Sequence, residues 1–243
     1  MKSKFLIIDT SSRLCSVAVT HGSKIIWSAS EINEKRFCHA EKLHVLIDNS
    51  LKDVFGSKHA SINELDAIAV ASGPGSYTGL RIGAAAAKGL ALPFNVPLIA
   101  YSSLAALAYA AKAQLSKEVQ ADAFWTAMDA KRLEVYSSLF DKNMVRISED
   151  KPFVLDEQSI PQEWMKYHNI WASGDGVEKA LEFWPNLKDT KIKYAQAKDA
   201  ISLVQFAWDK KDFVSVVNWV PNYLKTYKPG KTKLGLPKNA LKS

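Results

Sequence analysis

The chain has 243 residues, of which 47% are hydrophobic and 23% are charged. These fractions are typical of globular proteins and exclude a disordered, collagen-like or coiled-coil chain, and the length suits one large domain or two small ones. The net charge of +7 lies mostly at the C-terminus, because residues 221–243 contain six lysines and no acid. The rest of the chain is nearly neutral.

Hydrophobic runs are short throughout the sequence. The run at residues 5–8 is far shorter than the core of a signal peptide, and no run approaches the length of a membrane-spanning helix. The two cysteines, Cys15 and Cys38, supply neither a disulfide framework nor the ligand set of a structural zinc site. We therefore expect a cytoplasmic protein with no membrane partner.

The first half of the chain alternates between strand and helix patterns. Apolar runs and two-residue alternation predict strands at 5–8, 15–20, 24–30, 67–71 and 97–101. Apolar spacing of three and four residues predicts helices at 39–55, 78–92 and 102–114, the second ending at Pro93 and the third capped by Ser102. This order, βββαβαβα, indicates an α/β lobe.

The second half repeats two features of the first half in the same order. The strand that ends at Asp9 has a counterpart that ends at Asp129, and Ala-Ser-Gly-Pro-Gly at 71–75 recurs as Ala-Ser-Gly-Asp-Gly at 172–176. These matches favour a duplicated unit. Because the paired features lie closer together in the second half, we expect its helices to be shortened or missing. We predict an N-terminal lobe at 1–116, a smaller C-terminal lobe at 117–227 and a basic tail at 228–243.

Residues 72–83 form a glycine-rich loop between a predicted strand and a predicted helix. Such a loop can aim backbone N–H groups at an anion. It lacks the Gly-Lys-Ser/Thr end of a Walker loop and the glycine spacing of a dinucleotide fingerprint. The alternative is a tight turn, after which the small residues Gly79, Gly83 and Ala87 allow close packing of the helix. Both interpretations remain open from these residues alone.

Asp9 ends the first predicted strand and precedes three hydroxyl residues. An acid in this place can hold Mg²⁺ through water while hydroxyls and N–H groups face a phosphate. The same residue types are also ordinary in turns. The candidate nucleotide-binding residues are Asp9, Thr10, Ser11, Ser12, Gly73, Gly75 and Ser76.

The histidine spacing does not predict a metal site. His39 and His44 are five residues apart, so on a helix their side chains diverge by about 140° and cannot share a zinc ion as an i, i+4 pair would. Ser76 also lacks the flanking glycines of a Gly-x-Ser-x-Gly nucleophile elbow. We therefore predict neither a metal site nor catalytic residues.

Five motifs together resemble the TsaB family, also called YeaZ. They are Ile-Ile-Asp-Thr-Ser at 7–11, His-Ala-Glu-x-Leu at 39–43, Gly-Pro-Gly-Ser-Tyr-Thr-Gly-Leu-Arg-Ile-Gly at 73–83, Met-Asp-Ala-Lys-Arg-x-Glu-Val-Tyr at 128–136 and Pro-x-Tyr-Leu-Lys at 221–225. Lys131 and Lys225 stand where many relatives would have arginine. The resemblance implies the actin-like ATPase (ASKHA, RNase H-like) fold, with two lobes of duplicated topology and a shortened second lobe.

The resemblance also implies a role in placing a threonylcarbamoyl group on N6 of adenosine 37, in tRNAs that read codons beginning with A. In that system TsaC makes threonylcarbamoyl-AMP, and TsaD transfers the group with a metal held by an HxxxH pair. The corresponding histidines here, His39 and His44, are off that register by one residue. We therefore expect a non-catalytic scaffold and activator that binds TsaD and has no cofactor of its own. ATP and Mg²⁺ would act at the complex, TsaE would join it, and the chain alone would form a homodimer.

The predicted partner interface combines the apolar stripe of the 39–55 helix with the small-residue face of the next helix. Its residues are His39, Leu43, Leu46, Ile47, Gly79, Arg81, Gly83 and Ala87. For the leucines the alternative role is the protein's own core. Two other functions stay open: a nucleotide-binding ATPase that uses Asp9, and direct tRNA binding through a lysine tail that otherwise serves solubility. The candidate tRNA contacts are Lys225, Lys228, Lys231 and Lys233.

Overall fold

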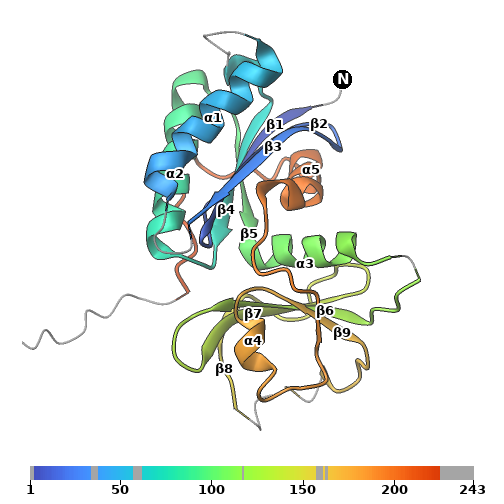
Figure 1. The fold of residues 1–243 in the computed structure, drawn as a ribbon. Helices are drawn as coiled ribbons and strands as arrows, with labels where there is room; N and C mark the ends of the chain where they lie inside the picture. The colour runs from blue at the N-terminus through green and yellow to red at the C-terminus, as the bar shows by residue number, and fades with distance from the viewer. Residues whose placement is uncertain are drawn as a thin grey trace, which may run out of the picture.

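The computed structural model describes residues 3–33, 38–56, 62–116, 118–156, 161 and 164–224. Two five-stranded sheets lie one above the other in Figure 1, with helix α3 between them. None of the helices within the described residues is long and apolar enough to cross a membrane. The four candidate tRNA contacts, Lys225, Lys228, Lys231 and Lys233, lie outside the described residues.

The first sheet has the strand order β3-β2-β1-β4-β5. Strand β2 runs antiparallel to its neighbours β1 and β3, and β4 and β5 run parallel to β1. The strand bounds are β1 Lys4–Asp9, β2 Leu14–His21, β3 Lys24–Ile32, β4 Ala67–Gly73 and β5 Leu98–Ser102. The helices are α1 His39–Phe55, the short 3₁₀ helix η1 Ile62–Glu64, α2 Tyr77–Phe94 and α3 Ser103–Gln114. The predicted order βββαβαβα is thus confirmed.

The second sheet repeats this pattern with the order β10-β9-β6-β7-β8. Strand β6 pairs antiparallel with β7 and parallel with β9, as β1 does with β2 and β4. The bounds are β6 Ala123–Asp129, β7 Glu134–Asp141, β8 Lys151–Val154, β9 Ile170–Ser173, α4 Val177–Ala180 and β10 Lys188–Asp189. Helix α4 has one turn where α2 has five, so the second lobe is shortened. The two copies confirm the predicted duplication of an α/β unit.

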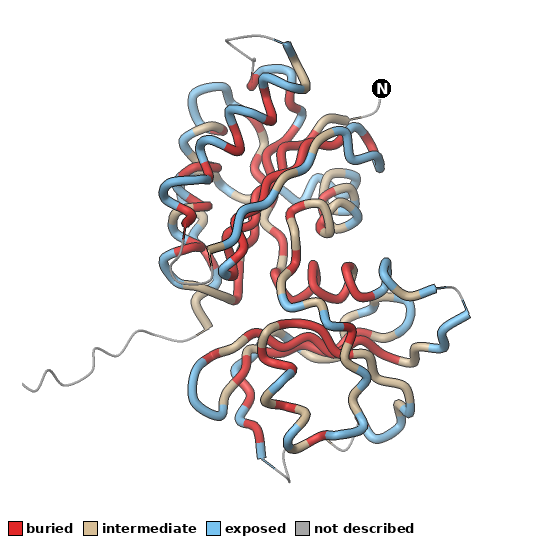
Figure 2. Tube along the Cα trace, viewed as in Figure 1, coloured by how far each residue is buried: buried red, intermediate tan, exposed pale blue. Residues whose placement is uncertain are grey.

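Both faces of the first sheet are covered, which explains the unbroken apolar run in β1. Leu6 and Ile8 face α1 and α2, while Phe5 and Ile7 face the opposite side, because successive strand residues alternate between faces. Helix α3 is buried on nearly all sides, since Ala108 packs with residues of the second sheet and Leu107 with those of the first. Figure 2 shows the resulting buried strands and the exposed outer turns.

The ends of α2 follow from single residues. The Ser76 hydroxyl caps the start by accepting the Gly79 N–H at 3.2 Å. Helix α2 continues through Pro93 to Phe94, two residues beyond the predicted end at residue 92, because the change to left-handed backbone occurs at Asn95, with φ of 53°. The predicted cap of α3 is confirmed, since the Ser102 hydroxyl accepts the Ala105 N–H.

The chain returns to the first lobe earlier than the predicted range of 117–227 implies. The 3₁₀ helix η3 Ala197–Ala200 and helix α5 Ile201–Lys210 pack with Phe5 and Ile7 of β1. Farther along, Val214 bridges to Leu98 of β5. Residues from about 195 to 224 therefore complete the first lobe, and the second lobe ends before them.

Candidate functional site at the cleft between the lobes

A cleft of about 420 Å³ separates the two lobes. Its walls come from equivalent places in the two copies: the β1–β2 turn and the loop before α2 on one side, the β6–β7 turn and the loop before α4 on the other. The lining residues are Ser11, Ser12, Arg13, Gly75, Ser76, Tyr77, Met128, Asp129, Ala130, Lys131, Tyr136 and Asp175. The duplicated topology thus brings four polar turns together, as expected at the carboxyl ends of parallel strands.

Gly75 is the position where the first wall requires glycine. A Cβ at this residue would lie 2.1 Å from the Ser11 carbonyl oxygen, and its φ is +155°. The neighbouring Ser76 N–H donates to the same Ser11 oxygen at 2.7 Å. The glycine loop therefore lies directly on the β1–β2 turn.

Asp9 does not line the cleft, although it was a candidate for holding Mg²⁺ beside a phosphate. Its side chain is fully buried, and the carboxylate accepts the Ser11 N–H at 2.9 Å, the Ser11 hydroxyl at 2.7 Å and the Tyr101 hydroxyl at 3.2 Å. Burial raises the pKa of Asp9 from 3.8 to about 6, against the opposing effect of these hydrogen bonds. The carboxylate is thus occupied by the chain's own donors.

The other predicted nucleotide-site residues divide between cleft and core. Ser11, Ser12, Gly75 and Ser76 line the cleft. Thr10 is buried and donates its hydroxyl to the Gly79 carbonyl at 2.8 Å, and a Cβ at Gly73 would meet the Asn222 carbonyl at 2.9 Å. Thr10 and Gly73 therefore serve packing rather than the cleft.

Seven of the eight residues predicted for the partner interface are buried in this chain's own core. Only Arg81 is exposed; the buried ones are His39, Leu43, Leu46, Ile47, Gly79, Gly83 and Ala87. An apolar stripe has the same spacing whether it packs on a sheet or on a partner, and here it packs on the chain's own sheet.

His39 and His44 also separate in space as their spacing predicts. The buried His39 ring places Nε2 2.8 Å from the Ser12 carbonyl, and burial lowers the pKa of the ring. His44 is exposed. Among the described residues, no group of three or more His, Cys, Asp or Glu side chains could hold a metal ion.

The second wall holds an ion pair that sequence reasoning missed. Lys179 of α4 donates to Asp129 at 2.6 Å and to the Arg132 carbonyl at 2.9 Å. Although burial opposes ionisation of Asp129, the hydrogen bond and charge of Lys179 lower its pKa. Asp175 accepts the Asp129 N–H at 2.9 Å, and burial raises the pKa of Asp175. The motif at 128–136 and the Gly-Asp-Gly at 174–176 mark parts of this wall in the sequence, but neither includes Lys179.

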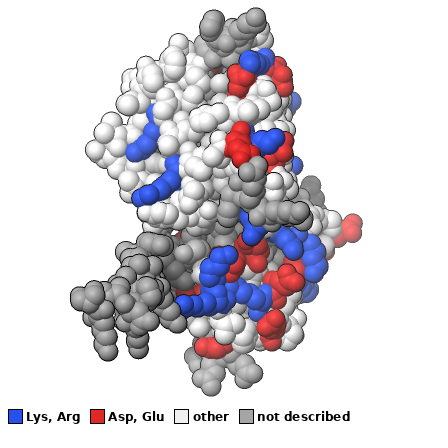
Figure 3. Space-filling model, turned by 60° about the vertical axis from the view of Figure 1, so that its left-hand side comes forward, with Lys and Arg blue, Asp and Glu red and all other residues white. Residues whose placement is uncertain are grey.

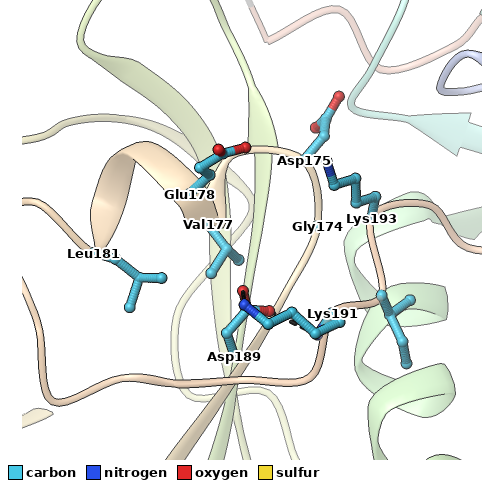
Figure 4. A pocket seen from close by; sticks show the side chains of 9 residues that line it. Gly174, Asp175, Val177, Glu178, Leu181, Asp189, Lys191 and Lys193 are labelled. Atoms are coloured by element: carbon cyan, nitrogen blue, oxygen red, sulfur yellow. Dashed lines mark hydrogen bonds and ion pairs between the residues drawn. The ribbon is translucent and has the colours of Figure 1, made fainter. Parts of the chain in front are cut away.

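A second pocket of about 310 Å³ lies on the other side of Asp175, within the second lobe (Figure 4). Val177 and Leu181 supply its apolar side, and Lys191 is paired with Asp189 at 2.9 Å. Asp175 lines both this pocket and the cleft. The loop before α4 is therefore the partition between the two hollows.

Comparisons with known proteins agree with this architecture. A family model described as TsaD, tRNA N6-adenosine threonylcarbamoyltransferase, matches residues 33–201. The tRNA threonylcarbamoyladenosine biosynthesis protein TsaB of Haemophilus influenzae is 31% identical over 231 residues, which cover 90% of this chain and 92% of the relative. The solved YeaZ of Pseudomonas aeruginosa superposes with a TM-score of 0.73 at 28% identity, over 91% of this chain and 100% of that one.

A partial match relates the chain to a transferase. The tRNA N6-adenosine threonylcarbamoyltransferase of Bacillus thuringiensis is 35% identical over 127 residues, which cover 46% of this chain and 35% of that protein. The match to TsaB, in contrast, spans nearly the whole of both chains. On its duplicated fold, its motifs and this full-length similarity, the chain belongs to the TsaB (YeaZ) family of tRNA threonylcarbamoyladenosine biosynthesis proteins.

Proposed function

We propose that this chain is a non-catalytic scaffold and activator in the threonylcarbamoylation of N6 of adenosine 37, in tRNAs that read codons beginning with A. It acts by binding TsaD and shifting TsaD toward its competent state. The pathway is supported by the names of the full-length relatives. The partner is supported by the partial likeness to a threonylcarbamoyltransferase, because related lobes present related surfaces that can pair.

The observation that carries the partner assignment is an apolar outer surface on the first lobe. Ala85, Gly89 and Leu92 follow one another at four- and three-residue steps along α2 and are exposed, Leu92 by 60%. Beside them Val217 is 69% exposed, held in place by a hydrogen bond from Lys88 to its carbonyl. Figure 3 shows few charged side chains on this side of the upper lobe. Exposed apolar patches of this kind mark protein interfaces.

The buried Asp9 supports a non-catalytic role. A carboxylate that is fully buried and bonded to Ser11 and Tyr101 does not reach a nucleotide in the cleft. We propose that ATP and Mg²⁺ act at the assembled complex, which TsaE joins, and that the α2 surface forms a homodimer when TsaD is absent. The ATPase alternative requires Asp9 to leave its present partners.

The test uses purified TsaD and TsaC with ATP and unmodified tRNA, with and without this chain. We expect modification to require the chain, and light scattering to show a mixed complex with TsaD. Leu92→Asp should weaken that complex by at least about tenfold, because burying a charge at an apolar interface costs more than about 1.4 kcal/mol. Phe206→Asp is the matched control, since Phe206 is 65% exposed on α5.

Two results would contradict the proposal. Full modification without the chain, together with no mixed complex, removes the scaffold role. Equal weakening by Leu92→Asp and Phe206→Asp removes the α2 surface from the interface. The ATPase alternative gains support only if the purified chain hydrolyses ATP and Asp9→Ala abolishes that hydrolysis while the fold is retained.

A further inference from the structure

The last described segment is tied to the edge of the cleft. Residues 213–224, here called the strap, cross the first lobe from α5 to the glycine loop (Figure 1). The Val214 N–H donates to the Leu98 carbonyl at 2.9 Å, and the Asn222 N–H donates to the Ser72 carbonyl at 2.7 Å. The motif at 221–224 therefore anchors the strap beside the glycine loop, a role that partner binding does not explain.

The anchored end builds an aromatic and cationic cluster on the first wall. Tyr223 of the strap lies with its ring centroid 4.7 Å from that of Tyr77, and the Arg81 guanidinium lies 4.3 Å from the Tyr77 centroid. Tyr77 lines the cleft and is still 42% exposed. Its ring and the Arg81 guanidinium are surfaces on which a nucleic-acid base can stack.

The second wall presents two cations on a strained turn. Lys131 and Arg132 both have left-handed backbone, with φ of 70° and 55°. Such backbone is costly for residues other than glycine, and it persists where the surroundings hold it. Here Asp129 accepts the Lys131 N–H at 2.9 Å and Lys179 donates to the Arg132 carbonyl. The Lys131 side chain is 85% exposed.

The basic residues of the second wall outnumber the acids that line the cleft. Lys131, Arg132 and Lys179 belong to this wall. Asp129 is paired with Lys179 at 2.6 Å and with Lys131 at 3.4 Å, and Asp175 is half-buried. Arg13 and Lys131 line opposite walls. Figure 3 shows basic side chains gathered over the second lobe, with a few acids among them.

We propose that the mouth of the cleft binds single-stranded RNA, with Arg13, Lys131 and Arg132 at the phosphates and an unstacked base against Tyr77 and Arg81. This combination of a cationic groove and exposed rings is how proteins hold single strands. RNA is favoured over an acidic protein because six lysines without an acid follow Leu224 in the sequence, directly after the anchored strap. The identification of this RNA as tRNA rests on the proposed function, whereas the binding of single-stranded RNA does not.

The test measures binding of a fluorescent, unmodified tRNA transcript to the full chain without TsaD, at several salt concentrations. Lys131→Gln combined with Arg132→Gln should weaken binding and reduce the slope of log affinity against log salt by about 1.4, at about 0.7 per lost contact. The matched control is Lys24→Gln with Lys142→Gln, because these exposed lysines follow the far ends of β2 and β7.

A second pair of variants tests stacking. Tyr77→Ala should weaken binding at least about fivefold with little change in the salt slope, whereas Tyr77→Phe keeps the ring and should bind like the wild type. A single-stranded oligonucleotide should compete with the tRNA better than a duplex of equal length. Thermal unfolding of each variant establishes that it is folded.

The proposal is overturned if the control pair weakens binding as much as the Lys131 and Arg132 pair, or if neither pair does. It is also overturned if these variants still bind RNA but no longer bind TsaD, because the mouth of the cleft then binds an acidic protein surface. Since RNA binding is measured without TsaD, failure here is distinguishable from failure of the scaffold role.

Discussion

Gly79→Ala should destabilise the protein, whereas Gly89→Ala, on the same helix, should stabilise it. A Cβ at Gly79 would lie 2.1 Å from the Thr10 carbonyl oxygen and 3.2 Å from the His39 ring. A Cβ at Gly89 would meet nothing within 4 Å. The two substitutions therefore add the same methyl group to α2, once against buried backbone and once in open space.

The magnitudes follow from these distances. At position 79, α2 must move by about 1 Å to reach normal contact, and such overpacking costs about 1 to 3 kcal/mol. The same movement strains the buried hydrogen bond from Thr10 to the Gly79 carbonyl, worth about 1 kcal/mol, and the helical preference of alanine offsets up to about 1 kcal/mol. The net loss is about 1 to 3 kcal/mol. At position 89 only the gain of about 1 kcal/mol remains.

The assay is thermal unfolding followed by calorimetry, supported by urea titration. For a chain of this length about 1 kcal/mol shifts Tm by about 2 to 4 °C. Gly79→Ala should therefore lower Tm by roughly 3 to 10 °C, and Gly89→Ala should raise it by roughly 3 °C. Equal shifts of Tm in the two variants would refute this reasoning. Loss of TsaD binding by Gly79→Ala at unchanged Tm would restore Gly79 to the partner interface.

Two further predictions concern buried charges. The free energy of unfolding of Asp9→Asn should rise relative to that of the wild type by up to about 3 kcal/mol between pH 4 and pH 7. In the wild type, burial raises the pKa of Asp9 to about 6, so its ionisation costs native stability as pH rises through that value. Parallel pH profiles of the two proteins in urea unfolding would contradict this. Lys179→Met should cost about 1 to 3 kcal/mol, since it removes one donor from Asp129 and one from each of two carbonyls. Lys191→Met removes an ammonium whose side chain is 82% exposed and should cost less than about 0.5 kcal/mol. Equal costs in thermal unfolding would show that Lys179 does not hold the turn.

Local patterns predicted the first lobe well because its elements are continuous in sequence and strongly periodic. The apolar stripe of α1 marks a helix that packs on the sheet, and the apolar run of β1 marks a buried strand of that sheet. Their observed bounds lie close to the predicted ones. The repeated Gly-x-Gly also predicted the duplication, because each copy needs a tight loop before its helix.

Long-range features could not be predicted in the same way. The apolar stripe of α1 predicts that Leu43 is buried, but it does not show what covers it. In the structure Leu43 packs on the chain's own sheet. The contact of Lys179 with Asp129 joins residues far apart in sequence, and the return of the chain after residue 195 depends on which face of the first sheet is left open. Neither this contact nor the return of the chain produces a periodic pattern in the sequence.

The return of the chain also governs the order in which the protein is completed during synthesis. Phe5 and Ile7 leave the ribosome early, but Ala197 and Val204, which cover them, leave near the end. At roughly 5 to 20 residues per second, the interval is roughly 10 to 40 seconds. The N-terminal lobe is therefore the last part to close, and its exposed β-sheet face is the surface on the nascent chain that a chaperone would protect.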